Sequence, residues 1–247
     1  MDFILLLAVV PPLFLMHYVY KLDSIEREPP RLIMKLVLLG MASCIPAGII
    51  ESLLCGFLFG FIDPSSTLAL LIENFLIIAM AEEGVKLWVT KRTWNDPAFN
   101  YRFDGVVYAV AASIGFALLE NIMYVFSTDG GELLTAIMRA ITSIPGHCTF
   151  GVFMGLYYGE AKLASVRGDE VLSRYMMKKA YHIPVLLHGF YDFVLSTEYD
   201  FMIIVFYVYI IVLYRYAKKR IQAAAMADEP LVPPQQTFFY NDRNPFF

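Results

Sequence analysis

The feature that most constrains this chain is a series of apolar segments, each about 20 residues long, enough to cross a bilayer's hydrocarbon core as an α-helix. Inside lipid every backbone N–H and C=O must be paired, so these segments are interpreted as helices. The sequence predicts an all-α, polytopic transmembrane helical bundle of about seven spans. We expect the spans at 2–20, 33–59, 67–90, 104–126, 133–160, 180–197 and 199–217.

The composition agrees with a multi-pass protein of the cell membrane. Hydrophobic residues make up 58% of the 247 residues and charged residues only 17%, whereas a soluble domain carries about 25% charged residues. The first apolar segment lacks the basic start of a secretory signal peptide, and Pro11 and Pro12 interrupt it. We therefore expect it to be a membrane span.

Among the connections between the predicted spans, only alternate ones contain lysine or arginine. The second, fourth and sixth connections contain neither residue. By the positive-inside rule this predicts an N-terminus outside and a C-terminus in the cytoplasm, because six or eight spans would put a basic cluster outside. Topology and anionic lipid explain the basic loops, so no nucleic-acid partner is expected. The basic positions are Lys21, Arg27, Arg31 and Lys35, then Lys91, Arg92 and Arg102, then Lys162, Arg167, Arg174, Lys178 and Lys179, and finally Arg215, Lys218, Lys219 and Arg220.

The chain shows one membrane domain and no soluble insertion. We assign residues 1–220 to one transmembrane domain, from which any chemistry has to come, and 221–247 to a cytoplasmic tail, whose prolines and polar residues predict disorder. The charged connection 161–179 predicts an amphipathic cytoplasmic helix. Cys44, Cys55 and Cys148 fall inside spans without paired spacing, so no disulfide is expected.

Function is sought among the ionisable residues inside the spans. Each costs at least ~2.5 kcal/mol near the bilayer centre, so each is a functional candidate. Their number exceeds what packing requires. They are Glu51, Glu73, Glu82, Glu83, Lys86, Asp104, Glu120, Arg139, His147, His188 and Asp192.

The third predicted span contains two adjacent glutamates, Glu82 and Glu83, followed by Lys86. Glu82 and Lys86 have i,i+4 spacing in the favourable order for an ion pair. We expect Lys86 to neutralise one carboxylate and to leave the other free as a general base. The structural alternative is an ion pair at the cytoplasmic end of the span, which leaves the second glutamate unexplained.

Three further spans carry polar residues that can join this pair. Glu120 shares a helix face with Phe116, and Arg139 is expected at a similar outer height as its partner. His147 follows Pro145 near mid-membrane. A rise of about 1.5 Å per residue places Glu120 nearer the outer face than the glutamate pair.

His188 and Asp192 are spaced i,i+4 on one face of the sixth span. The same helical rise places Glu83 and His188 at similar depths, so these two can meet. A lone intramembrane histidine is often only a hydrogen-bonding residue between helices. Two histidines together with a glutamate pair favour a functional site.

These residues form motifs that resemble the PrsW-type intramembrane proteases. The motifs are Glu-Glu-x-x-Lys at 82–86, Phe-x-x-x-Glu at 116–120 and His-x-x-x-Asp at 188–192, with similar stretches at 28–29, 104–108 and 143–147. The likeness covers about residues 10–196. The family is similar in motif and presumed fold to the CAAX prenyl endopeptidases.

The resemblance implies an intramembrane peptidase that hydrolyses a bond of a membrane-protein or peptide substrate. Some members make the first cut in an anti-sigma factor, on its extracytoplasmic side, during a stress response. Carried onto this chain, the resemblance makes Glu82, Glu83 and His188 the catalytic group, which Glu120 and His147 complete. Lys86 and Asp192 are expected to support this group. A glutamate that activates water requires neither a cofactor nor a metal.

Three other functions remain open from the sequence. Glutamate and histidine ligands from several helices can hold zinc, although no His-Glu-x-x-His helix is present. Such residues also form the proton relays of coupled transporters, although no inverted repeat is visible. The third alternative is a catalytically silent scaffold. Glu51, Glu73 and Arg139 receive no role.

Overall fold

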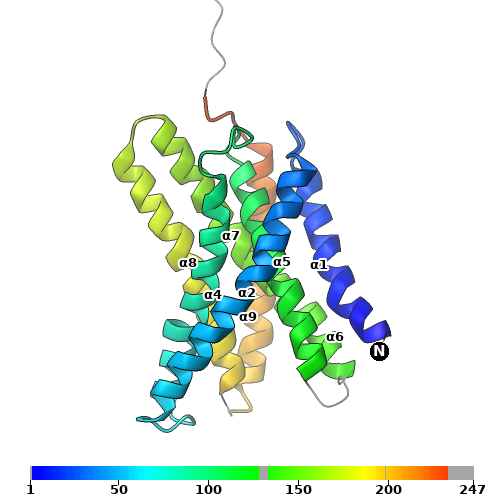
Figure 1. Ribbon diagram of the computed structural model, residues 1–247, viewed down its shortest axis with the longest axis vertical. Coiled ribbons are helices and arrows are strands. Elements are labelled where there is room, and N and C mark those ends of the chain that lie inside the picture. Colours follow the sequence, from blue (N-terminus) through cyan, green and yellow to red (C-terminus); the bar gives the residue numbers. More distant parts are fainter. Residues whose placement is uncertain (1, 128–132, 198, 233–247) are drawn as a thin grey trace, which may run out of the picture.

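The computed structural model describes residues 2–127, 133–197 and 199–232, and its long helices pack side by side in one bundle (Figure 1). No strand occurs in these ranges, so the predicted all-α fold is confirmed. The elements are α1 (Asp2–Leu22), α2 (Pro30–Phe59), α3 (Thr67–Leu71), a π-helix η1 (Ile72–Ile78), α4 (Ala79–Thr90), a 3₁₀ turn η2 (Lys91–Thr93), α5 (Asp104–Ser127), α6 (Leu133–Ile141), α7 (Ser143–Val166), α8 (Glu170–Ser196) and α9 (Met202–Met226).

Helix length and surface composition fit a membrane protein. Three described helices are long and apolar enough to cross a bilayer: Ile4–Leu22, Pro30–Phe59 and Asp104–Tyr124. Large apolar side chains also face outward, including Leu53 and Phe57 on α2, as expected for a surface that contacts lipid rather than water. The start of α1 and the end of α9 lie at opposite ends of the bundle (Figure 1). This placement agrees with an odd number of crossings, while seven spans and their orientation stay predictions.

Helix α5 forms the centre of the bundle. Every side chain from Phe103 to Leu118 is buried, whereas α2 and α9 each bury only one side. A helix that is apolar on all sides is stable only when other helices surround it. Helices α1, α2, α4 and α7 all contact α5, so polar groups on α5 face protein rather than lipid.

Two glycines let α2 and α5 approach closely. A Cβ atom built at Gly40 of α2 would lie 2.2 Å from the backbone oxygen of Ala112, and one at Gly115 of α5 would lie 2.1 Å from that of Val37. Small residues at such crossings allow backbone contact between membrane helices. The contact is reciprocal, so it fixes both the distance and the register of the two helices.

Replacing Gly40 by alanine is therefore expected to lower the free energy of unfolding by about 1–3 kcal/mol, because the added methyl forces the backbones apart. Gly48→Ala is the matched control on the same helix, since nothing lies within 4 Å of its Cβ position. The control is expected to retain full stability. The check is thermal unfolding of both purified variants, and equal melting temperatures would contradict this packing.

Three boundaries differ from the sequence prediction. The fifth predicted span is two helices, α6 and α7, which separate at Thr142. Pro145 lies in the first turn of α7, where the missing N–H costs no helical bond. The segment 161–179 is helical, but as the end of α7 and the start of α8, which only residues 167–169 separate. The prediction of a separate amphipathic helix there is wrong.

The expected tail begins within a helix, because α9 continues to Met226. Residues 227–231 then pack back on the bundle. Leu231 donates its N–H to the backbone oxygen of Asn100 at 2.8 Å, and Glu229 pairs with Arg102 at 3.0 Å. Residues 233–247, for which disorder is predicted, lie outside the described residues.

Candidate active site

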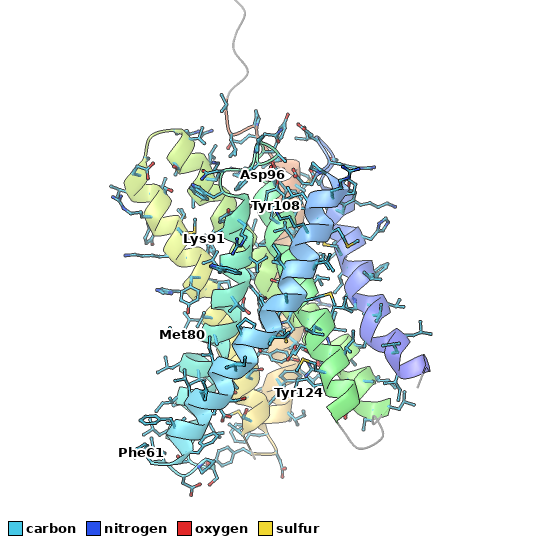
Figure 2. The ribbon with its side chains drawn as sticks, in the orientation of Figure 1. Phe61, Met80, Lys91, Asp96, Tyr108 and Tyr124 are labelled. Atoms are coloured by element: carbon cyan, nitrogen blue, oxygen red, sulfur yellow. The ribbon has the colours of Figure 1, made fainter. Side chains whose placement is uncertain are left out.

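Glu82 and Glu83 lie near the start of α4, directly after the π-helix η1. Short π-helical segments are rare and occur frequently at functional sites. Figure 2 shows Met80, two residues before the pair, between Lys91 toward one end of the bundle and Phe61 at the other. The glutamate pair thus lies inside the bundle and not at the end of a span.

The Lys86 ammonium is the centre of the cluster and is fully buried. Its Nζ lies 2.9 Å from Glu82 Oε2, 2.8 Å from Glu83 Oε1 and 3.0 Å from His147 Nδ1. The three hydrogens of the ammonium therefore all have acceptors. The prediction that Lys86 pairs with only one carboxylate is wrong. Nζ also lies 4.2 Å from the centre of the Phe116 ring, a cation–π contact.

The imidazole of His188 lies between three carboxylates. Its Nδ1 is 2.9 Å from Glu83 Oε1, and its Nε2 is 3.1 Å from Asp192 Oδ2 and 3.8 Å from Glu82 Oε2. The predicted meeting of the glutamate pair with His188 is confirmed. The Phe150 ring stacks on the imidazole with 4.9 Å between centroids, so the ring has one orientation.

A glycine brings α8 close enough for this contact. A Cβ atom at Gly189, next to His188, would lie 2.5 Å from Cδ1 of Phe75 in η1. Because glycine has no such atom, α8 packs directly against the π-helix that precedes the glutamate pair. The sequence placed Gly189 beside His188 but gave no indication of its partner.

His147 joins Glu120 to the rest of the cluster. Its Nε2 lies 2.8 Å from Glu120 Oε2, and Arg139 Nη2 lies 3.0 Å from the same oxygen. The predicted contact between Glu120 and Arg139 is thus present. An ammonium only donates hydrogen bonds, so Nδ1 of His147 accepts from Lys86 and its Nε2–H donates to Glu120. The imidazole spans the difference in depth that separates Glu120 from the glutamate pair.

Two residues of the cluster were missed from the sequence. These residues are Asn121 and Phe150. Asn121 accepts at Oδ1 a hydrogen bond from Nε of Arg139 at 2.6 Å, and Phe150 packs against both histidines. Asn121 carried a usable signal, since it is a polar residue in a span beside Glu120. Phe150 carried none, because an aromatic residue in an apolar helix has no distinctive pattern.

A cavity of about 680 Å³ adjoins the cluster, and only some of the cluster faces it. Glu83 and Lys86 are absent from its lining. Glu82 is therefore the carboxylate of the pair that a molecule in the cavity can reach. The lining has six ionisable residues from the cluster: Glu82, Glu120, Arg139, His147, His188 and Asp192.

The cavity extends away from the basic loops. Beyond Asp192 it is lined by Leu195 and Ser196 at the end of α8 and by Ile203 at the start of α9. Glu51 also lines it, and its Oε1 is buried without a hydrogen-bond partner among the described residues. Glu73 is absent from the lining.

Sequence relatives place this arrangement in a known family. The family described as "PrsW family intramembrane metalloprotease" matches residues 28–217. The chain belongs to the PrsW family. The Protease PrsW of Clostridioides difficile (strain 630) is 34% identical over 212 residues, which cover 85% of this chain and 86% of the relative. No solved structure matches the chain.

Other relatives of the PrsW family agree with this assignment. The Protease PrsW of Geobacillus kaustophilus is 33% identical over 77% of this chain and 79% of that protein. The Protease PrsW of Bacillus subtilis (strain 168) is 29% identical over 77% of this chain and 81% of that protein. The resemblance that the motifs indicated is confirmed, and the family is one of membrane proteases.

The family description implies a metal, and the cluster can be tested for one. Donor atoms of Glu82, Glu83, His147 and His188 lie within 4.8 Å of one another, and all four are ligand types that zinc accepts. However, Lys86 Nζ lies within hydrogen-bond distance of three of them. A divalent ion there would displace or repel a buried ammonium. The residues as arranged therefore hold an ammonium and do not fit a metal.

Proposed function

We propose that this PrsW-family chain hydrolyses a peptide bond of a membrane-protein substrate with a water molecule that Glu82 activates. The observation that carries the proposal is the position of Glu82, which lines the cavity while Lys86 holds its Oε2 at 2.9 Å. His188 lines the same cavity with Nε2 3.8 Å from Glu82 Oε2. A base and a hydrogen-bond donor thus face one space, as amide hydrolysis requires.

The proposed reaction runs through a tetrahedral intermediate. The water oxygen attacks the peptide carbonyl carbon, and the Glu82 carboxylate takes the water proton. The carbonyl becomes an oxyanion that accepts a hydrogen bond from Nε2–H of His188 in place of Asp192. Glu82 then gives its proton to the amide nitrogen, the C–N bond breaks, and a carboxyl and an amine are released.

The other residues of the cluster act by positioning in this proposal. Glu83 holds His188 Nδ1 at 2.9 Å and Lys86 at 2.8 Å. His147 and Glu120 extend the same chain of hydrogen bonds from Lys86 to Arg139. This chain fixes Glu82 in one rotamer, and such preorganisation lowers the barrier because less reorientation is needed during the reaction.

The proposed substrate is a single-span membrane protein that enters from the end opposite the basic loops. The cavity lining reaches the end of α8 and the start of α9 at that side. With the predicted orientation this side is extracytoplasmic. Entry from the extracytoplasmic side agrees with the position of the cut in an anti-sigma factor that the family resemblance implies. We therefore propose an anti-sigma factor as the substrate class.

Co-expression with tagged single-span proteins tests the function. Cleavage is expected with the wild-type chain and is expected to disappear with His188→Ala, because no donor then reaches the oxyanion. Immunoblotting of the tagged product measures it, with chain levels compared in the same samples. A scaffold or a proton-coupled transporter would leave the substrate uncut in both cases, and cleavage that persists in His188→Ala would contradict the assigned role.

Metal removal tests the arrangement around Lys86. Purified protein treated with 1,10-phenanthroline, which binds transition metals but not calcium or magnesium, is expected to retain its cleavage rate. The reason is that the ammonium occupies the space between the donor atoms. The measurement is the product formed per minute before and after treatment. Loss of activity that zinc restores would show that Lys86 gives way to a metal.

A further inference from the structure

A second group of buried acids lies at the other end of the bundle. Asp23 and Glu28 belong to the loop between α1 and α2, and Asp104 is the first residue of α5. Their exposed fractions are 1%, 2% and 0%. One carboxylate oxygen from each lies within 4.8 Å of the other two. The three residues come from separate parts of the chain, and the fold brings them to one point.

The surrounding hydrogen bonds fix two of these carboxylates. Asp104 Oδ2 accepts the backbone N–H groups of Asn100 at 3.0 Å and Tyr101 at 2.7 Å. The hydroxyl of Tyr108, which is fully buried, donates to Glu28 Oε2. The acids therefore have defined positions and are not a flexible surface patch.

Several oxygens of this group have no partner within the described part of the chain. Both carboxylate oxygens of Asp23 and Oδ1 of Asp104 are buried without a hydrogen bond of normal geometry. Their nearest polar contacts are the backbone of Glu28 for Asp23 and the carboxyl of Glu28 for Asp104. No described lysine or arginine forms an ion pair with Asp23, Glu28 or Asp104. Buried carboxylates are normally paired or bound to a metal, because an isolated charge in the interior is costly. The buried carboxylate of Asp23 therefore has no cation as a partner among the described residues.

The effect of this burial is visible in the two loop residues. Removal from water raises the pKa of Asp23 to about 6 and that of Glu28 to about 7. Neighbouring negative charges raise both pKa values further, first Asp228 for Asp23 and Asp23 for Glu28, while the positive charge of Arg27 lowers the pKa of Asp23. A bound cation would compensate these charges and supply the partner of the free oxygens.

We propose that Asp23, Glu28 and Asp104 bind a hard divalent cation of the Ca²⁺, Mg²⁺ or Mn²⁺ type. The donor set consists only of carboxylate oxygens, which these ions prefer, and it offers no nitrogen or sulfur for a softer metal. The ion would tie the α1–α2 loop to the start of α5, the central helix. The role is structural, and the site is separate from the cluster around Lys86.

Cation titration of the purified full-length chain tests the site. The protein is treated with EDTA, the chelator is removed, and CaCl₂, MgCl₂ or MnCl₂ is added while the melting temperature and the heat of binding are recorded. At least one ion is expected to raise the melting temperature by about 5–10 °C at hundredfold excess over its Kd. No response to any of the three ions would overturn the proposal, and would mean that the carboxyls are protonated instead.

Three variants locate the binding. Asp23→Asn is expected to abolish the temperature rise, whereas Asp200→Asn, which makes the same change at an exposed position between α8 and α9, is expected to keep it. Glu82→Gln is expected to keep it as well, because that residue belongs to the other cluster. An equal response in Asp23→Asn would overturn the proposal. If Asp23→Asn fails to accumulate, Tyr108→Phe takes its place, because it frees Glu28 and is expected to weaken binding.

Discussion

Replacing Glu82 by glutamine is expected to lower the rate of substrate cleavage by about 10²–10⁴-fold, the usual contribution of a general base. Glutamine keeps the size of the side chain and can still accept from Lys86 Nζ. It cannot take a proton from water at neutral pH. The loss should therefore appear in the rate of the chemical step, measured in a single turnover, with little change in melting temperature.

Two comparisons sharpen the test of Glu82. Glu82→Asp keeps the carboxylate but shortens the side chain by one methylene. Because positioning contributes to the rate, the cleavage rate is expected to fall only in part. Glu73→Gln removes another carboxylate of the same membrane segment that is absent from the cavity lining, and full activity is expected. If Glu82→Gln cleaves at the wild-type rate, Glu82 is not the base.

Replacing Lys86 by methionine is expected to destabilise the fold by about 3–5 kcal/mol, because it leaves buried carboxylates without their cation. For a chain of this size that corresponds to a fall in melting temperature of roughly 6–20 °C. Glu82, Glu83 and His147 would lose their common hydrogen-bond donor at the same time. Thermal unfolding of the purified variant measures the effect.

A second substitution shows whether the stability loss in Lys86→Met comes from unpaired charge or from altered packing. The double variant Lys86→Met with Glu83→Gln is expected to recover part of the lost stability, since one unpaired carboxylate disappears with the lysine. Lys178→Met, at an exposed position on α8, is the matched control and should melt with the wild type. A Lys86→Met chain as stable as the wild type would show that the ammonium does not hold the cluster together.

Much of the fold followed from the apolar segments, because their length permits few structures in lipid. The ends of helices were less predictable. The break at Thr142 lies three residues before Pro145, which belongs to the first turn of the new helix that begins at Ser143. The extension of α8 back to Glu170 crosses charged sequence. A helix that projects beyond the bilayer needs no apolar residues, so hydropathy cannot locate its end.

The cluster was predictable in its members but not in its connections. Intramembrane charge singled out the glutamate pair, and helical rise correctly placed Glu83 beside His188. The role of His147 as the link between Lys86 and Glu120 depends on the crossing of α4, α5 and α7, which spacing within one helix does not contain. For the same reason the sequence did not reveal which glutamate faces the cavity.

The buried acids Asp23, Glu28 and Asp104 also depend on contacts that the sequence does not contain. Glu28 and Asp104 both lie in stretches that resemble the family, while Asp23 drew no attention in the sequence. Its importance comes only from the fold, which buries it beside two other carboxylates. An acidic residue in a loop becomes a candidate ligand only when its neighbours in space are known.

The most direct test of the central claim is cleavage of a single-span substrate by the purified chain in liposomes without an ion gradient. The account predicts that the wild type releases two fragments and that Glu82→Gln and His188→Ala each release at least about 100-fold less, although both remain folded. Cleavage at the wild-type rate by either variant, or cleavage by the wild type only when a gradient is imposed, would contradict it.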